Sequence, residues 1–184
     1  MGRQTFASSD VAEFPPASNT AVTASATRTN LWVPSIWTPI SAFDLKPGRS
    51  WILRCGGVFT TTGTQGTIIF NPTFGQSSTP ASNIALGASS TLTWTASLTG
   101  VSWWAELVVG IRQIGIAAAG STITGTGYVV LSGASTAVSQ TVIMGGTVPT
   151  TADHTTAQGL ALDVTLSAAS QSITCQWTSL QNLS

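Results

Sequence analysis

The C-terminal segment, residues 159–183 (GLALDVTLSAASQSITCQWTSLQNL), constrains the fold more than any other stretch. Apolar and polar side chains alternate over 160–166 and 173–178, on either side of a small polar link at 167–170. The alternating apolar positions are Leu160, Leu162, Val164, Leu166, Ile173, Cys175 and Trp177. A period of two is typical of β-strands with one face on a core and the other on water. We therefore expect two strands joined by a hairpin turn or a short crossing loop, with Trp177 in the core and Asp163 facing water.

Similar apolar stretches separated by turn residues occur through most of the preceding chain. Strands are predicted at 51–61, 67–70, 90–98, 101–113, 121–132 and 138–144, with a short one near Ile84 and Leu86. The turn at 62–66 predicts that 67–70 pairs with 51–61 as a hairpin, and Asn71-Pro72 is expected to end that strand. Gly56-Gly57 predicts a bulge or a close crossing, and Gly145-Gly146 is expected to end the strand before it.

The residue types also favour strands over helices. Strong helix formers such as Glu, Lys, Arg and Met are scarce, whereas Thr, Val, Ile and Trp are plentiful. Short strands spaced by turn signals, with no predicted helix, are typical of an all-β sandwich or barrel with antiparallel connections.

The first 45 residues show less regular patterning. Residues 1–30 are rich in Ser, Thr, Ala and Asn, and Phe14-Pro15-Pro16 forces an extended segment. We interpret 1–30 as an N-terminal arm, either a disordered tail or a segment that orders on a binding partner. Residues 31–45 are apolar but interrupted by prolines, which predicts an edge strand or a strap, with Trp32 and Trp37 packed on the body.

Charge and targeting signals narrow the class of protein. Charged residues make up 7% of the chain, against roughly 25% in an ordinary soluble domain. So little charge repulsion favours a subunit whose surface is occupied by neighbours; a secreted Ser/Thr-rich β-protein is the alternative. The six basic residues are scattered, which argues against nucleic-acid binding. No apolar run reaches the length of a membrane span, and the N-terminus lacks the apolar centre of a signal peptide.

The absence of a signal peptide leads us to expect synthesis and assembly in a cytoplasm. In such a reducing compartment Cys55 and Cys175 are expected to be buried free thiols, although they could pair if the fold brings them together.

The predicted strand at 101–113 carries adjacent tryptophans. Because neighbouring residues of a strand face opposite ways, at most one of Trp103 and Trp104 lies in the core. The face with Trp104 also carries Glu106, Val108 and Arg112, so it is only half polar. Trp104 is therefore interpreted as part of a subunit interface, with a second core layer or a platform for sugar rings as alternatives.

No constellation of catalytic or metal-binding residues can be recognised in the sequence. His154 is the single histidine, and Asp153 beside it cannot orient it as in a catalytic triad merely by adjacency. The acids Asp10, Glu13, Asp44, Glu106, Asp153 and Asp163 include no marked pair. We expect a non-enzymatic protein without a metal or cofactor, and a loop around His154 that its own polar side chains cap.

The closing sequence resembles the C-terminal end of jelly-roll virion proteins of tailed bacteriophages, especially phages that infect actinobacteria. The resemblance is carried by LALDVTL, the Ser/Ala turn, the SIT strand, the Leu-Asn elements near the end and the run from Pro149 to Thr156. The rest of the chain is similar to that group in strand count and in its Ser/Thr/Ala/Gly-rich, Lys-poor composition.

The resemblance implies a jelly-roll-like antiparallel β-sandwich over residues 31–184, preceded by the extended arm. It implies an oligomeric capsid decoration protein on the virion surface, usually a homotrimer, that binds the major capsid protein and stabilises the particle. A minor tail or fibre-tip protein that binds a host glycan is the alternative. The candidate capsid contacts in the arm are Phe6, Val11, Phe14, Pro15 and Pro16. The candidate subunit-interface residues are Trp32, Trp37, Trp104 and Val108.

Overall fold

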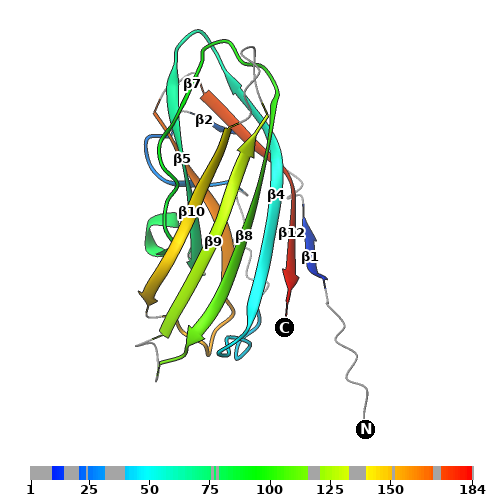
Figure 1. Cartoon of the computed structure of the whole chain (residues 1–184), viewed down its shortest axis with the longest axis vertical. Coiled ribbons are helices and arrows are strands. Elements are labelled where there is room, and N and C mark those ends of the chain that lie inside the picture. Colours follow the sequence, from blue (N-terminus) through cyan, green and yellow to red (C-terminus); the bar gives the residue numbers. More distant parts are fainter. Residues whose placement is uncertain are drawn as a thin grey trace.

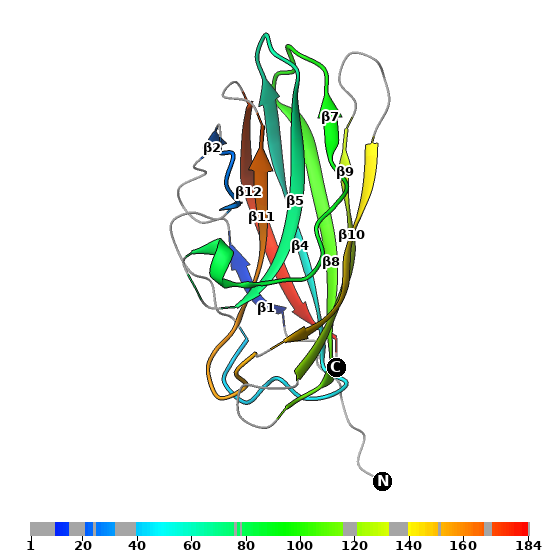
Figure 2. The same ribbon diagram turned by 90° about the vertical axis from the view of Figure 1, so that its left-hand side faces the viewer.

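In the computed structural model, the chain forms two antiparallel β-sheets that pack face to face (Figures 1 and 2). It describes residues 10–14, 21–23, 25–31, 40–75, 77, 79–115, 121–132, 140–150, 152–167 and 171–183, with the backbone alone at 10–14 and 147–150. The all-β antiparallel sandwich that the strand pattern predicts is confirmed. Within these residues the single helical element is the 3-10 helix η1 (Pro80–Ser82).

The larger sheet contains most of the long strands. Its order is β1 (Asp10–Phe14), β12 (Gln171–Asn182), β4 (Ser50–Thr61), β8 (Val101–Gln113), β9 (Ser121–Leu131) and β10 (Gln140–Thr150), and β2 (Val22–Thr23) also pairs with β12. The smaller sheet has the order β3 (Thr29–Asn30), β11 (Gly159–Leu166), β5 (Gly66–Gly75) and β6 (Ile84–Ala85), and β7 (Leu92–Trp94) pairs with β5. The predicted strands at 51–61, 101–113 and 121–132 correspond closely to β4, β8 and β9.

The predicted hairpin between 51–61 and 67–70 is wrong, because β4 and β5 belong to different sheets. The strand also continues through Pro72 to Gly75. Pro72 accepts a hydrogen bond from Leu86 N at 2.9 Å. In an antiparallel strand the N–H and C=O of one residue point to the same side, so the missing N–H lies toward the short β6 and the ladder to β11 is intact. The β11–β12 link likewise joins the two sheets and is a crossing loop rather than a hairpin turn.

Two further boundaries differ from the prediction for local reasons. The strand predicted at 90–98 is reduced to β7, because Thr61 Oγ1 donates to Thr95 O and accepts from Leu98 N, both at 3.0 Å, while Ser97 adopts a φ of 64°. The strand predicted at 138–144 corresponds to β10, and it does not end at Gly145-Gly146. Gly145 takes a φ of 115° and donates to Gly87 O at 2.9 Å, yet the pairing of β10 with β9 continues to Thr150.

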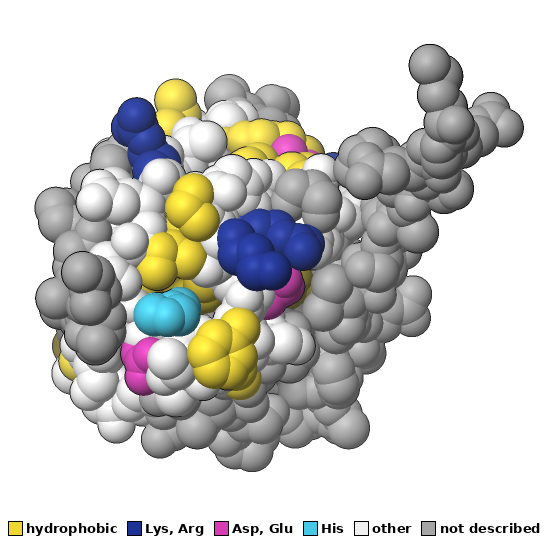
Figure 3. Space-filling model, turned by 90° about the horizontal axis from the view of Figure 1, so that it is seen from below, with side chains coloured by type: hydrophobic (Ala, Val, Ile, Leu, Met, Phe, Trp, Pro, Cys, Tyr) yellow, Lys and Arg dark blue, Asp and Glu magenta, His cyan; other side chains and the backbone are white. Residues whose placement is uncertain are grey.

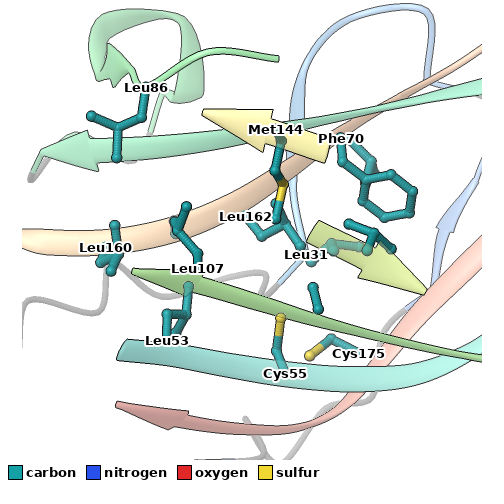
Figure 4. Packing of buried hydrophobic residues seen from close by; sticks show 14 of the residues in the cluster. Leu31, Leu53, Cys55, Phe70, Leu86, Leu107, Met144, Leu160, Leu162 and Cys175 are labelled. Atoms are coloured by element: carbon teal, nitrogen blue, oxygen red, sulfur yellow. The ribbon is translucent and has the colours of Figure 1, made fainter. Parts of the chain in front are cut away.

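The core lies between the sheets and is filled by large side chains (Figure 4). Its largest fully buried members include Trp51, Trp103, Phe59, Phe70 and Phe74. Cys55 and Cys175 lie in this core as free thiols, as expected. Burial raises the pKa of the Cys55 thiol, which keeps this thiol protonated and unreactive at neutral pH.

The three strands β1, β2 and β3 form edge strands of both sheets. β1 and β2 pair with the outer edge of β12, with Phe14 opposite Thr178 and Val22 opposite Ile173. β3 pairs with β11, where Asn30 lies opposite Asp163. The segment predicted as an arm therefore covers two sheet edges that would otherwise expose unpaired backbone groups. The domain boundary at residue 30 stays a prediction.

Candidate interaction surface

A β-bulge in β12 turns Trp177 away from the core. Cys175 lies opposite Gly57 and Trp177 lies opposite Gly56, so Gln176 is an extra residue in the ladder. One inserted residue reverses which side chains face inward from that point on. Trp177 is 43% exposed and Thr178 is buried. The expectation that Trp177 lies in the core is therefore wrong.

The glycine pair of β4 explains the location of the bulge. A Cβ on Gly57 would lie 1.9 Å from Thr174 O, so any other residue would collide with the bulged backbone of β12. A Cβ on Gly56 would lie 2.8 Å from Cζ2 of Trp177, which shows that the indole covers Gly56. The bulge or close crossing predicted at Gly56-Gly57 is confirmed.

Trp104 lies on the outer face of β8, next to the same glycine. Gly56 is paired with Trp104 on one side and with Trp177 on the other. Trp104 is 39% exposed and contacts Tyr128 of β9 edge-on, with ring centroids 5.2 Å apart. Trp103 points the other way into the core and donates from Nε1 to Thr174 O at 3.2 Å. The expectation that at most one of the two tryptophans is in the core is confirmed.

Four large side chains share this outer face of the larger sheet. Tyr128 is paired with Ile143 of β10, which is 77% exposed. In Figure 1, β8, β9 and β10 lie side by side, and β4 separates β8 from β12. We call the group the aromatic band, and its members are Trp104, Tyr128, Ile143 and Trp177. Val108, two positions beyond Glu106 on β8, is half-buried on the same face.

An ion pair lies within the aromatic band. Arg54 and Glu106 are paired across β4 and β8, and Arg54 Nε lies 2.7 Å from Glu106 Oε2. Both side chains are partly exposed. Because the two charges cancel, the centre of the face has no net charge.

The remaining candidate contact residues all lie within residues 6–37. Phe6, Pro15, Pro16, Trp32 and Trp37 lie outside the described residues. Val11 and Phe14 lie in β1, of which the backbone alone is described. The pairing of Phe14 with Thr178 nevertheless places β1 beside Trp177, at one border of the aromatic band.

The loop around His154 is capped by its own side chains, as predicted. Asp153 Oδ1 accepts hydrogen bonds from Thr155 N at 2.8 Å and from Thr155 Oγ1 at 2.6 Å. These bonds lower the pKa of the Asp153 carboxyl. The His154 ring packs edge-on against Phe43, with centroids 6.3 Å apart, at the end of the sandwich that Figure 3 views. The described residues contain no group of three or more His, Cys, Asp or Glu side chains that could hold a metal ion.

The outer face of the smaller sheet is covered at Asp163, and the expectation that Asp163 faces water is wrong. Its side chain is 0% exposed, and Arg28 Nε lies 3.5 Å from its Oδ2. Arg28 Nη2 also donates to Pro80 O and, at 3.4 Å, to Asn83 O. Arg28 thus joins the N-terminal segment, β11 and the η1 segment, a name that we use for Ser77 and residues 79–83. Burial raises the pKa of Asp163 to about 6, against smaller opposing effects of the Thr73 hydroxyl and the Arg28 charge.

The alternation in the sequence places Trp104 and Val108 on the outer face of β8, as the structure has them, but it gives no sign that Trp177, Tyr128 and Ile143 share that face. The available signal for Trp177 was the Gly56-Gly57 pair, because a bulge opposite those glycines reverses the alternation in β12. Neither a scan against protein-family models nor a search of curated proteins finds a match for this chain. In the described part of the chain, no helix is long and apolar enough to cross a membrane.

Proposed function

We propose that this protein is a non-enzymatic structural subunit of a virion that assembles through the outer face of its larger sheet. Its most specific role would be a homo-oligomeric capsid decoration protein that binds the major capsid protein. The resemblance of the C-terminal segment to phage virion proteins supports the class of protein. The low charge content supports a surface that is occupied by neighbours.

The aromatic band is the observation that carries the proposal. Trp104, Trp177 and Ile143 are large apolar side chains that stay exposed on one sheet face. Contiguous apolar patches of this kind on a folded domain mark interaction sites. A sheet face offers a broad surface of low net charge, which suits contact with another folded protein.

Attachment to a capsid would depend on several weak contacts acting together. An oligomer that presents one contact per subunit gains avidity, because each contact after the first is intramolecular. β1 lies at the border of the aromatic band, so residues 1–9 would reach a capsid surface from there. Because β1, β2 and β3 belong to the sheets of the body, the deletion that tests the arm is 2–9 and not 2–30.

The solution mass of the purified chain tests the proposal. We expect light scattering to give a multiple of the 18.8 kDa chain, most simply three, over a wide concentration range. Trp104→Ser with Trp177→Ser should reduce the mass to that of one chain while the circular dichroism stays unchanged. Phe43→Ser is the matched control, since Phe43 is 63% exposed at the end of the sandwich and outside the band. A wild-type monomer at every concentration, or a double variant that still assembles, would contradict the proposal.

A carbohydrate-binding role in host adsorption is the second candidate function. The exposed rings of Trp104 and Trp177 can stack on sugar rings, and Arg54 and Glu106 beside them can hydrogen-bond to hydroxyl groups. Glycan binding by a monomeric wild-type protein, lost in Trp104→Ser, would favour this function over assembly.

A further inference from the structure

A pocket of about 290 Å³ lies away from the aromatic band, where the end of β5 meets the η1 segment and the loop before β11. Phe74 and Gly75 come from β5, and Ala152, Asp153 and Gln158 come from the loop. The η1 segment contributes Ser77, Ser82 and Asn83, and Ile84 is the first residue of β6. Three separate parts of the chain therefore build one concave site at the end of the smaller sheet.

The wall formed by the η1 segment is held in place by hydrogen bonds. Asn83 donates from Nδ2 to Ser77 O and accepts at Oδ1 from Ser77 N, both at 2.9 Å. A Cβ on Gly75 would lie 2.3 Å from Asn83 Oδ1, so glycine permits the amide to pack on the backbone of β5. Arg28 binds the carbonyl groups of Pro80 and Asn83 from the sheet side. The wall is thus positioned before any ligand arrives.

The opposite wall contributes two side chains that each keep one hydrogen-bond acceptor unused. Gln158 is 4% exposed, and its Nε2 donates to Asp153 O at 2.8 Å and to Thr156 Oγ1 at 3.0 Å. Both bonds use the nitrogen, so Oε1 remains as an acceptor. Asp153 uses Oδ1 for both of its bonds to Thr155, which leaves Oδ2. The lowered pKa of Asp153 means that its carboxylate is ionised at neutral pH.

The chemistry of the lining selects a class of ligand. A carboxylate and an amide oxygen require a ligand that donates hydrogen bonds, and the ionised Asp153 repels anions. Ile84 is half-buried at the pocket and suits a C–H face of the ligand, whereas Phe74 is fully buried. The volume is at the small end of the range for ligand pockets, about 300 to 1,000 Å³, which fits one sugar residue.

We propose that this pocket binds a single neutral sugar residue, whose hydroxyl groups donate to Asp153 Oδ2 and Gln158 Oε1. The site is separate from the aromatic band, and the proposal does not rest on the proposed function. Ser82 at the rim would supply a further hydroxyl contact, since it lines the pocket from η1.

Saturation-transfer NMR on the full chain tests the site. Glucose, galactose, mannose and N-acetylglucosamine are offered separately at millimolar concentration, with methylammonium as a cationic and acetate as an anionic comparison ligand. We expect transfer to at least one sugar and none to acetate. Asp153→Asn should lower the affinity for that sugar at least tenfold. Ser82 is exposed, and Ser82→Phe should abolish binding because the larger side chain fills the pocket.

Asp44→Asn is the matched control, because it removes a partly exposed acid that lines neither the pocket nor the aromatic band and should leave sugar binding unchanged. Transfer to no sugar would overturn the proposal, and so would transfer to methylammonium alone. Sugar binding that survives Ser82→Phe but is lost in Trp104→Ser would also overturn it and assign the sugar to the aromatic band. The assembly proposal is tested by the mass from light scattering and the pocket proposal by sugar binding, so either proposal can be overturned while the other stands.

Discussion

On the larger sheet, the outer face leaves Trp104, Trp177 and Ile143 exposed to solvent. On the smaller sheet, the outer face buries the carboxylate of Asp163 under Arg28 and the η1 segment. On the larger sheet, no described segment covers the apolar side chains, and we call this the open face. On the smaller sheet, Arg28 and the η1 segment cover an ionisable side chain, and we call this the covered face. The difference shows that burial on an outer face is decided by the segments that cross it and not by the polarity of the strand.

The largest expected effect comes from breaking the ion pair on the covered face. Arg28→Met removes the counter-charge of a fully buried carboxylate, and we expect a loss of about 3 to 5 kcal/mol in the free energy of unfolding at neutral pH. Arg54→Met is the matched control on the open face and should cost at most about 1 kcal/mol, because that pair is partly exposed. Denaturant unfolding of both variants measures the difference. Equal losses would show that the two faces do not differ in this way.

The pH dependence of stability should come from the covered face. Asp163 has a pKa of about 6 in the folded protein, above its usual value of about 3.9. Between these values Asp163 binds more protons in the folded state than in the unfolded chain. Its contribution to stability is therefore fully present below about pH 4 and is lost as the pH rises through about 6. We expect this contribution to reach a few kcal/mol. Asp163→Asn should remove most of the slope between pH 4 and 6 in denaturant titrations. An unchanged slope would contradict the burial of this carboxyl.

The bulge that exposes Trp177 should depend on Gly57. Gly57→Ala places a methyl group against the carbonyl of Thr174, so we expect a loss of about 1 to 3 kcal/mol in thermal or denaturant unfolding. Gly63→Ala is the control, since a Cβ there meets nothing within 4 Å, and it should change stability by no more than about 0.5 kcal/mol. Similar stability of the two variants would argue against the close approach of β4 and β12.

The smallest effect is expected within the open face itself. A double-mutant cycle with Trp104→Leu and Tyr128→Leu should give a coupling energy of about 0.5 to 1.5 kcal/mol, because the rings meet edge-on. Unfolding at a dilution where the protein is one chain isolates this contact from assembly. A coupling energy of zero would show that the two rings do not support each other.

Much of the fold could be predicted, because alternation reports directly on strands. It found β8 with both of its ends and divided Trp103 from Trp104 correctly. Alternation does not report which sheet a strand joins, so the 62–66 turn was interpreted as a hairpin although it connects the two sheets.

The site was harder to predict, since its determinants are distant in sequence. Trp177 was assigned to the wrong face because a single residue inserted at Gln176 reverses the alternation, and its cause lies in β4. The burial of Asp163 depends on Arg28, which belongs to a segment with no clear pattern. The pocket gathers residues from three segments, and no local motif marks it.

Oxidative footprinting with hydroxyl radicals tests the role of the open face most directly. Trp104, Trp177 and Phe43 are all exposed in the single chain, so their labelling can be compared in one sample by mass spectrometry. As the protein concentration rises, we expect the extent of labelling to fall at Trp104 and Trp177 and to stay constant at Phe43. If the labelling of Trp104 and Trp177 does not change with protein concentration, the aromatic band is not an assembly interface.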